Sequence, residues 1–166
     1  LYPDGFTPHI TSNITDASVC AGIRSQMGNG WIVDFSNSYG KNLFHYYITG
    51  TNNASLQDAS PTDFDAGGHS LSQNVTGLDF SKYFENIAAG FNLAYGAEYR
   101  TENFEIFAGE EGSYAQYDTN LVAVTNPAIQ SPATDDNGEQ LPGGSQGFPG
   151  YSPLNVVDRS RSNLGL

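Results

Sequence analysis

The sequence has one cysteine, six Lys and Arg residues and no long apolar run. The single cysteine, Cys20, excludes an internal disulfide framework and a cysteine-based zinc site. Six cationic residues stand against 18 acidic ones, so the net charge is −12. Surfaces that bind nucleic-acid phosphates or anionic lipid headgroups need clustered Lys and Arg. Binding to nucleic acid or to an anionic membrane surface through such a cluster is therefore not expected. Because no stretch of about 18 apolar residues occurs, no transmembrane helix is expected.

Aromatic residues and turn-forming residues are abundant instead. Aromatics make up 13% of the chain, and 19 Gly and eight Pro accompany them. Aromatic side chains favour strands, and they are depleted in disordered chains. The length of 166 residues suits one domain. We therefore predict an all-β domain with long polar loops. The start at Leu1 and the alternating residues 161–166 lead us to expect a piece of a longer protein.

A period-two alternation of apolar and polar residues predicts antiparallel strands. The expected strands cover residues 13–27, 31–49, 70–84, 88–107 and 157–166. Gly28-Asn29-Gly30 predicts a tight turn between the first two, because Asn and Gly tolerate positive φ. Glu85-Asn86 predicts a second short turn.

The second and fourth of these strands each combine an aromatic face with a polar face. The aromatic faces hold Trp31, Phe35, Tyr39, Phe91, Tyr95 and Tyr99. The opposite faces carry, among other polar residues, Asp34, Asn92, Glu98 and Arg100. Such a polar face suits a watery or plug-filled barrel lumen, whereas charges in the core of a soluble sandwich would need partners. Any antiparallel sheet with one solvated face alternates in the same way, so alternation alone leaves both readings open.

The connections between the expected strands alternate between short and long. The long loops cover residues 50–69 and 108–156 and contain no Lys or Arg. Short turns at one end and long loops at the other are typical of transmembrane β-barrels. The second loop carries four aromatic residues that could bind a ligand or partner, or pack the loop on itself: Tyr114, Tyr117, Phe148 and Tyr151. Its residues 135–139 lack the full ligand spacing of a calcium loop, which favours an Asx-type turn.

Several segments, in order along the chain, resemble the β-barrel region of TonB-dependent outer-membrane receptors, in particular the large Bacteroidetes type. The segments are residues 5–8, 31–40, 53–56, 60–68, 91–100, 105–106, 108–110 and 147–153. The most specific of them reads Phe-Asn-Leu-Ala-Tyr-Gly-Ala-Glu-Tyr-Arg, at 91–100. The resemblance implies that the whole chain is a fragment of a large, 22-stranded transmembrane β-barrel in the bacterial outer membrane, without its plug domain.

The resemblance also implies a function in nutrient uptake, for a metal chelate, an oligosaccharide or a peptide. The aromatic faces would then be lipid-facing and the polar faces lumen-facing. The implied partners are the rest of the parent barrel, its plug domain and the TonB system, with a surface lipoprotein as a further candidate. It implies no enzymatic activity, no catalytic or metal-binding residues and no bound cofactor.

Two other functions are compatible with a β-rich acidic chain. The first is a secreted β-sandwich that binds carbohydrate through its loop aromatics. The second is a glycosidase, which requires two carboxylates at a defined separation. Glu98, Glu102 and Glu105, or Glu110 and Glu111, are nominal candidates, but we expect a lumen-facing charge at Glu98 and a solvated acidic loop for the others. The histidines His9, His45 and His69 have no metal-ligand spacing, so ordinary surface or girdle positions are expected for them.

Overall fold

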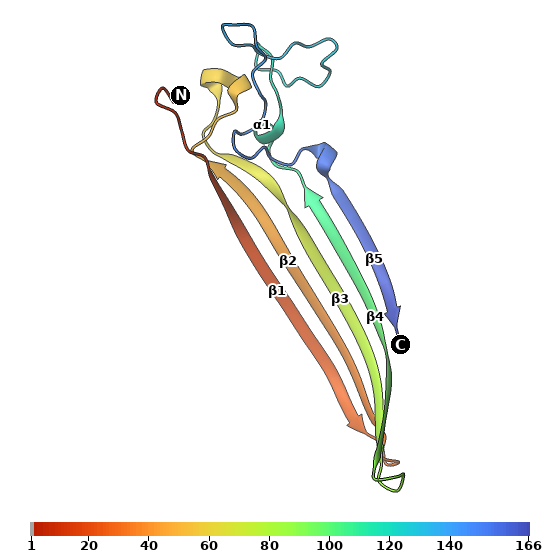
Figure 1. Ribbon diagram of the computed structural model, residues 1–166. Helices are drawn as coiled ribbons and strands as arrows, with labels where there is room; N and C mark the ends of the chain where they lie inside the picture. Colours follow the sequence, from red (N-terminus) through yellow and green to blue (C-terminus); the bar gives the residue numbers. More distant parts are fainter. Residues whose placement is uncertain (1) are drawn as a thin grey trace. The chain divides into compact units, whose positions relative to one another are not determined.

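A computed structural model describes residues 2–166 and shows one five-stranded antiparallel sheet (Figure 1). The strands are β1 (His9–Gln26), β2 (Ile32–Thr49), β3 (Phe64–Phe84), β4 (Phe91–Phe107) and β5 (Val157–Gly165). Their spatial order is the chain order, so each strand pairs with the next one along the sequence. The all-β prediction is confirmed.

Two strands begin earlier than the alternation predicts. β1 starts at His9 instead of residue 13, and β3 starts at Phe64 instead of residue 70. In β1 the apolar residues change sides, with Ile10 and Ile14 on one face and Val19 on the other, which hides the period of two. In β3 the first residues include two adjacent glycines, which normally weaken a strand prediction. The first long loop is therefore shorter than expected, because residues 64–69 belong to the sheet.

The two predicted turns are confirmed. Between β1 and β2, the Gly30 N–H donates to the Met27 carbonyl at 2.9 Å, and Gly30 has φ +83°. Between β3 and β4, the Gly90 N–H donates to the Ile87 carbonyl at 3.0 Å. Positive φ at these glycines costs little because they carry no Cβ. The remaining bounds differ from the predicted ones by three residues or fewer.

Contacts divide the residues into two compact units. The loop unit consists of Leu1–Ile14, Leu43–His69 and Glu105–Asp158. The strand unit consists of Thr15–Asn42, Ser70–Phe104 and Arg159–Leu166. The loop unit contains twelve acidic residues and no Lys or Arg, whereas the strand unit contains six acidic residues and all six cationic ones. The whole net charge of the chain therefore lies in the loop unit.

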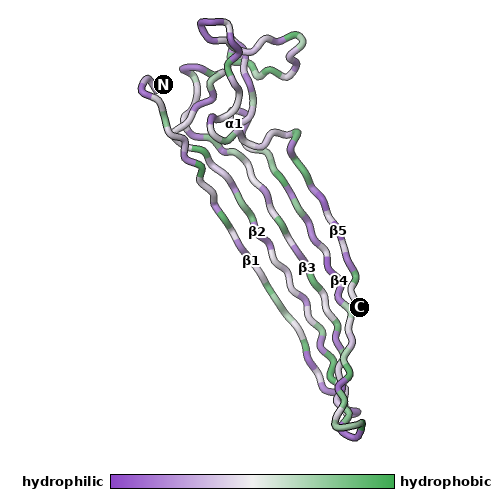
Figure 2. Tube along the Cα trace, viewed as in Figure 1, coloured by the Kyte–Doolittle hydropathy of each residue, from purple (hydrophilic) through white to green (hydrophobic). Residues whose placement is uncertain are grey.

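The strand unit has no hydrophobic core of its own. Among residues 2–166, every buried hydrophobic residue belongs to the loop unit. Figure 2 shows hydrophobic and hydrophilic residues alternating along the strands. The strand unit is thus a sheet whose apolar side chains stay exposed within the described chain.

The loop unit buries mostly small polar residues. Its hydrophobic core contains Ile48, Phe64, Ala66, Tyr117 and Ala133, and its buried polar residues are Thr51, Asn53, Ser55, Ser60, Ser113 and Ser145. The long connection after β4 contains a short helix, α1 (Glu111–Tyr114), and a 3₁₀ turn, η2 (Pro153–Asn155). A further 3₁₀ segment, η1 (Ala54–Ala59), follows β2. The loops are therefore packed together, which the lack of regular alternation did not predict.

Candidate functional site

Aromatic rings gather on one face of the strand unit. Tyr95 stacks on Phe80 with ring centroids 5.3 Å apart, and its ring meets the edge of Trp31 at 5.7 Å. Phe84 contacts both Trp31 at 6.5 Å and Phe91 at 6.2 Å. These contacts place Trp31, which directly precedes β2, and residues of β3 and β4 on a common face, named here the aromatic face.

The aromatic face remains open. Tyr95 is 55% exposed and Tyr99 49%, and Phe35, Tyr39 and Phe91 are exposed to a similar degree, while Trp31 is half-buried. In a water-soluble domain, rings of this size normally supply the core because each buries a large area. A contiguous exposed apolar surface of this kind marks an interaction with a partner or a membrane.

The opposite, polar face of the strand unit contains matched charges. The Arg100 guanidinium donates to Glu98 at 2.7 Å, and Glu102 pairs with Arg161 and accepts from the Gln73 amide. The expected alignment of Glu98 and Arg100 on one face is borne out by this pair. Both carboxylates are paired with cations, which is unlike the two facing carboxylates that glycoside hydrolysis uses.

A shallow hollow lies on the same polar face. It has a volume of about 440 Å³, and Ser36, Ser38, Asp79 and Glu98 are among the residues that line it. Of the other two residues singled out from the sequence, Asp34 is half-buried and Asn92 is exposed. The strand unit thus has an aromatic face, where Lys82 lies over the rings of Trp31 and Phe84, and an opposite face with the paired charges.

In the loop unit, the side-chain amide of Asn53 links the loop after β2 to the loop after β4. Its Nδ2 donates to the carbonyls of Gly112 at 2.9 Å and Ala115 at 2.8 Å. Its Oδ1 accepts from the Ser55 N–H at 3.1 Å and the Ser55 hydroxyl at 2.7 Å. Asn53 is fully buried, and every hydrogen-bonding position of its amide group is used.

The four loop aromatics predicted as ligand or partner contacts have different positions. Tyr117 is only 8% exposed, its N–H donates to the Ser55 hydroxyl, and its phenol donates to Glu111 at 3.2 Å. Phe148 and Tyr151 pack against Tyr46 of β2, with ring centroids 5.7 and 6.5 Å away. Tyr114 is half-buried. Tyr117 therefore packs the loop on itself, while rings of the other three remain partly accessible.

The position of Tyr117 makes the loop unit sensitive to alkali. Burial, followed by the charge of Glu111, raises the pKa of Tyr117 to about 12. The unfolded chain releases this proton near its ordinary pKa of 10. The protonated phenol of Tyr117 therefore stabilises the folded loop unit fully below pH 10, and this contribution is lost as the pH rises towards 12. We expect the free energy of unfolding of the loop unit to fall by on the order of 2–3 kcal/mol over this range.

Near-ultraviolet circular dichroism during urea unfolding at pH 8, 10 and 12 would measure this loss. Tyr117→Phe should show a smaller decline with pH, although it starts from a lower stability because the bond to Glu111 is absent. Tyr114→Phe is the matched control and should decline like the unmodified chain. An identical decline in Tyr117→Phe would contradict the assignment.

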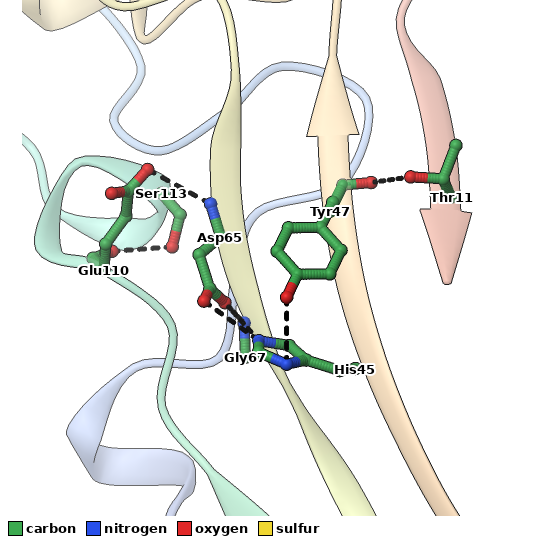
Figure 3. Close-up of polar contacts among 7 residues, drawn as sticks. All are labelled: Thr11, His45, Tyr47, Asp65, Gly67, Glu110 and Ser113. Carbon is green, nitrogen blue, oxygen red and sulfur yellow. Dashed lines mark hydrogen bonds and ion pairs between the residues drawn. The ribbon is translucent and has the colours of Figure 1, made fainter. Parts of the chain in front are cut away.

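A second polar cluster lies where β2 and β3 reach the loops (Figure 3). His45 Nε2 lies 2.8 and 2.9 Å from the two carboxylate oxygens of Asp65. The Tyr47 hydroxyl lies 3.1 Å from His45 Nδ1. Because a carboxylate only accepts, the His45 Nε2–H donates to Asp65, and in the neutral form of the ring Nδ1 can then accept from the Tyr47 hydroxyl. His45 is therefore part of a hydrogen-bonded series, which the expectation of an ordinary surface or girdle residue does not include.

Asp65 is itself held by its neighbours. Its Oδ1 accepts from the Gly67 N–H at 2.8 Å, and its own N–H donates to Glu110 Oε1 at 3.1 Å. The Ser113 hydroxyl in turn donates to the Glu110 carbonyl at 2.7 Å. These bonds, drawn in Figure 3, join the start of β3 to the loop that contains α1.

The predicted Asx-type turn at Asp135 is confirmed. Asp135 Oδ1 accepts from the N–H groups of Asn137 and Glu139, each at 2.9 Å. The bond from the Glu139 N–H is the main reason that the pKa of Asp135 lies below its ordinary value. Throughout residues 2–166 there is no group of three His, Cys, Asp or Glu side chains arranged to hold a metal ion.

Comparisons of the chain with family models, with curated proteins and with solved structures found no match. In the part of the chain that the structure describes, no helix has the length and apolar character needed to cross a membrane. Functional inference therefore depends on the chemistry of the two units.

Sequence reasoning missed the two polar clusters of the loop unit. Asn53 lies in an Asn-Ala-Ser segment that looks like an ordinary loop, and nothing in its spacing indicates burial. His45 and Tyr47 are two residues apart on β2, so a shared face could have been noticed from the alternation. Their partner Asp65 lies at the start of β3, in the segment that was assigned to a loop.

Proposed function

We propose that the chain forms part of the wall of a transmembrane β-barrel, in an outer-membrane transporter of the TonB-dependent receptor type. The observation that carries the proposal is the open aromatic face of the strand unit, which has no buried hydrophobic residue among residues 2–166. A β-sandwich in water would cover such a face with a second sheet. In a membrane, lipid covers such a face directly, so no second sheet is needed.

The lengths of the strands are compatible with this proposal. A membrane-crossing strand needs about 9–11 residues. The part of β2 that belongs to the strand unit is residues 32–42, and the part of β1 is residues 15–26. Both reach that length. Strands in lipid also require paired edges, so the outer edges of β1 and β5 would pair with further strands of a parent barrel.

The polar face supports a wet interior. The side chains of the Glu98–Arg100 ion pair are 41–48% exposed, which suits a surface that faces water or a plug domain. The transported nutrient would pass this face. The acidic loop unit would lie in water, where it could contact a nutrient or a surface partner.

Spin labelling in the full chain, reconstituted in detergent or bilayer as part of its parent protein, tests the proposal. Nitroxides at Tyr95 and Tyr99 should collide with oxygen, which dissolves in lipid. A nitroxide at Glu98, on the opposite face, should collide with a water-soluble nickel reagent. Ile87, in the turn between β3 and β4, is a control position that should respond to nickel.

Other patterns of collision would reject the proposal. If the labels at 95 and 99 are shielded from both reagents, the aromatic face is covered by protein, and a secreted carbohydrate-binding sandwich becomes the better interpretation. If they respond to nickel, the face lies in water and the chain is not a barrel wall.

A further inference from the structure

Tyr47, His45 and Asp65 form a continuous hydrogen-bonded series, named here the Tyr–His–Asp series (Figure 3). Its members come from two neighbouring strands, β2 and β3. Tyr47 lies at one end, with its hydroxyl 3.1 Å from His45 Nδ1, and in the neutral form of the ring this nitrogen accepts from the phenol. The carboxylate of Asp65 lies at the other end and fixes the ring tautomer.

This order of groups matches the general arrangement of an activated nucleophile. Such a site needs a hydroxyl or thiol within hydrogen-bonding reach of a base, and a third group that orients the base. In the Ser-His-Asp arrangement the carboxylate also stabilises the imidazolium that forms when the base takes the proton. Here the phenol of Tyr47 occupies the position of the nucleophile.

The surroundings hold the base in place. The edge of the Phe107 ring contacts His45, with centroids 5.2 Å apart at 83°. The Gly67 N–H binds one oxygen of Asp65. The charged groups at this position are Asp63, Asp65 and Glu110, all acidic, and the loop unit contains no Lys or Arg that would oppose a positive charge on His45.

Tyr47 is also accessible from solvent. Tyr47 lines a hollow of about 250 Å³, together with Ile48, Thr49, Asp63, Phe64, Asp65 and Glu110. The volume is large enough for a small acyl compound, and the hollow lies entirely within the loop unit.

We infer that Tyr47 is a nucleophilic modification site that accepts an acyl group from an activated aryl ester. Tyr47 Oη attacks the ester carbonyl carbon while His45 Nδ1 takes the phenol proton. The new Oη–C bond replaces the bond to the aryl oxygen, and the aryl oxide leaves and takes the proton from His45. The products are an acylated Tyr47 and a free phenol, with no oxidant or reductant needed. This inference does not depend on the transport function.

Acetylation by p-nitrophenyl acetate tests the inference on the full chain. Peptide mass spectrometry over a time course gives the rate for each of the ten tyrosines. Tyr47 should react at least about tenfold faster than the other tyrosines, since general base catalysis contributes on the order of 10²–10⁴-fold. Its rate should also decrease in D₂O, because the proton moves during the attack.

Variants assign the role of each group. His45→Ala should lower the Tyr47 rate to that of the other tyrosines and abolish the effect of D₂O. Asp65→Asn keeps an oxygen for the Gly67 N–H but removes the charge, so it should lower the rate by at least about threefold. His69→Ala is the matched control, because the His69 ring packs on Phe44 and Tyr46, and it should leave the rate unchanged.

Two results would overturn the inference. The first is a Tyr47 rate in the unmodified chain that equals the rates of the other tyrosines, a comparison that requires no variant and no assumption about folding. The second is an unchanged Tyr47 rate in folded His45→Ala, with folding checked by circular dichroism.

Discussion

Asn53→Ala is expected to destabilise the loop unit by about 3–5 kcal/mol. The substitution removes four side-chain hydrogen bonds from a fully buried position. Each such bond contributes about 0.5–1.5 kcal/mol net, and buried partners left without a bond add to the loss. The Gly112 carbonyl would lose this partner, whereas the Ala115 carbonyl keeps the Gly144 N–H and the Ser55 hydroxyl keeps the Tyr117 N–H. Denaturant unfolding followed by near-ultraviolet circular dichroism measures the effect.

Asn52→Ala is the matched control for this prediction. Asn52 is the preceding residue, and its side-chain oxygen accepts no hydrogen bond from any described residue. Its backbone carbonyl accepts from the Gln146 N–H, a bond that the substitution retains. We expect its effect to stay within about 1 kcal/mol. Amide hydrogen exchange at residues 112–117 should accelerate in Asn53→Ala alone, and equal acceleration in both variants would refute the role of Asn53.

Gly67→Ala should disrupt the junction between β3 and the end of β4. A Cβ at this position would lie 2.4 Å from the Phe107 carbonyl oxygen and 2.5 Å from the Gly109 nitrogen. Both are backbone atoms, so they cannot avoid the clash by a rotamer change. The backbone also has φ +75°, which L-residues rarely adopt. We expect a loss of about 3 kcal/mol or more, measured as a shift of the denaturant midpoint.

Gly28→Ala provides a comparison for Gly67→Ala. A Cβ at Gly28 would have no atom within 4 Å, and its φ is not positive. This substitution should leave the denaturant midpoint almost unchanged. If Gly67→Ala were tolerated as well as Gly28→Ala, the close approach of β3 to residues 107–109 would be wrong.

The sequence predicted the parts of the fold that repeat a simple local pattern. The alternation in residues 91–100 predicted β4 and the separation of Tyr95 from Glu98, because successive side chains of a strand point to opposite faces. The Gly28-Asn29-Gly30 turn followed from the tolerance of these residues for positive φ.

The structure of the loops depends on contacts that no local pattern encodes. Asn53 forms hydrogen bonds to residues about sixty positions away in the sequence. Position 67 requires glycine because the backbone there lies close to the Phe107 carbonyl. The Tyr–His–Asp series forms only when β2 and β3 pair in the correct register. This register could not be predicted, because the glycines at the start of β3 weaken the strand pattern there. The exposure of the four loop aromatics also depends on such long-range contacts, so the sequence does not predict it. The sequence does predict that all four lie in the long loop after β4.

The uneven distribution of charge has a consequence for the solution around the loop unit. Twelve acidic groups without a compensating cation attract an atmosphere of small counterions and repel dissolved anions. In physiological salt this field decays over about 8 Å, and in 0.01 M salt it extends to about 30 Å. Encounters between the loop unit and charged solutes should therefore depend steeply on ionic strength, and those of the charge-balanced strand unit should not.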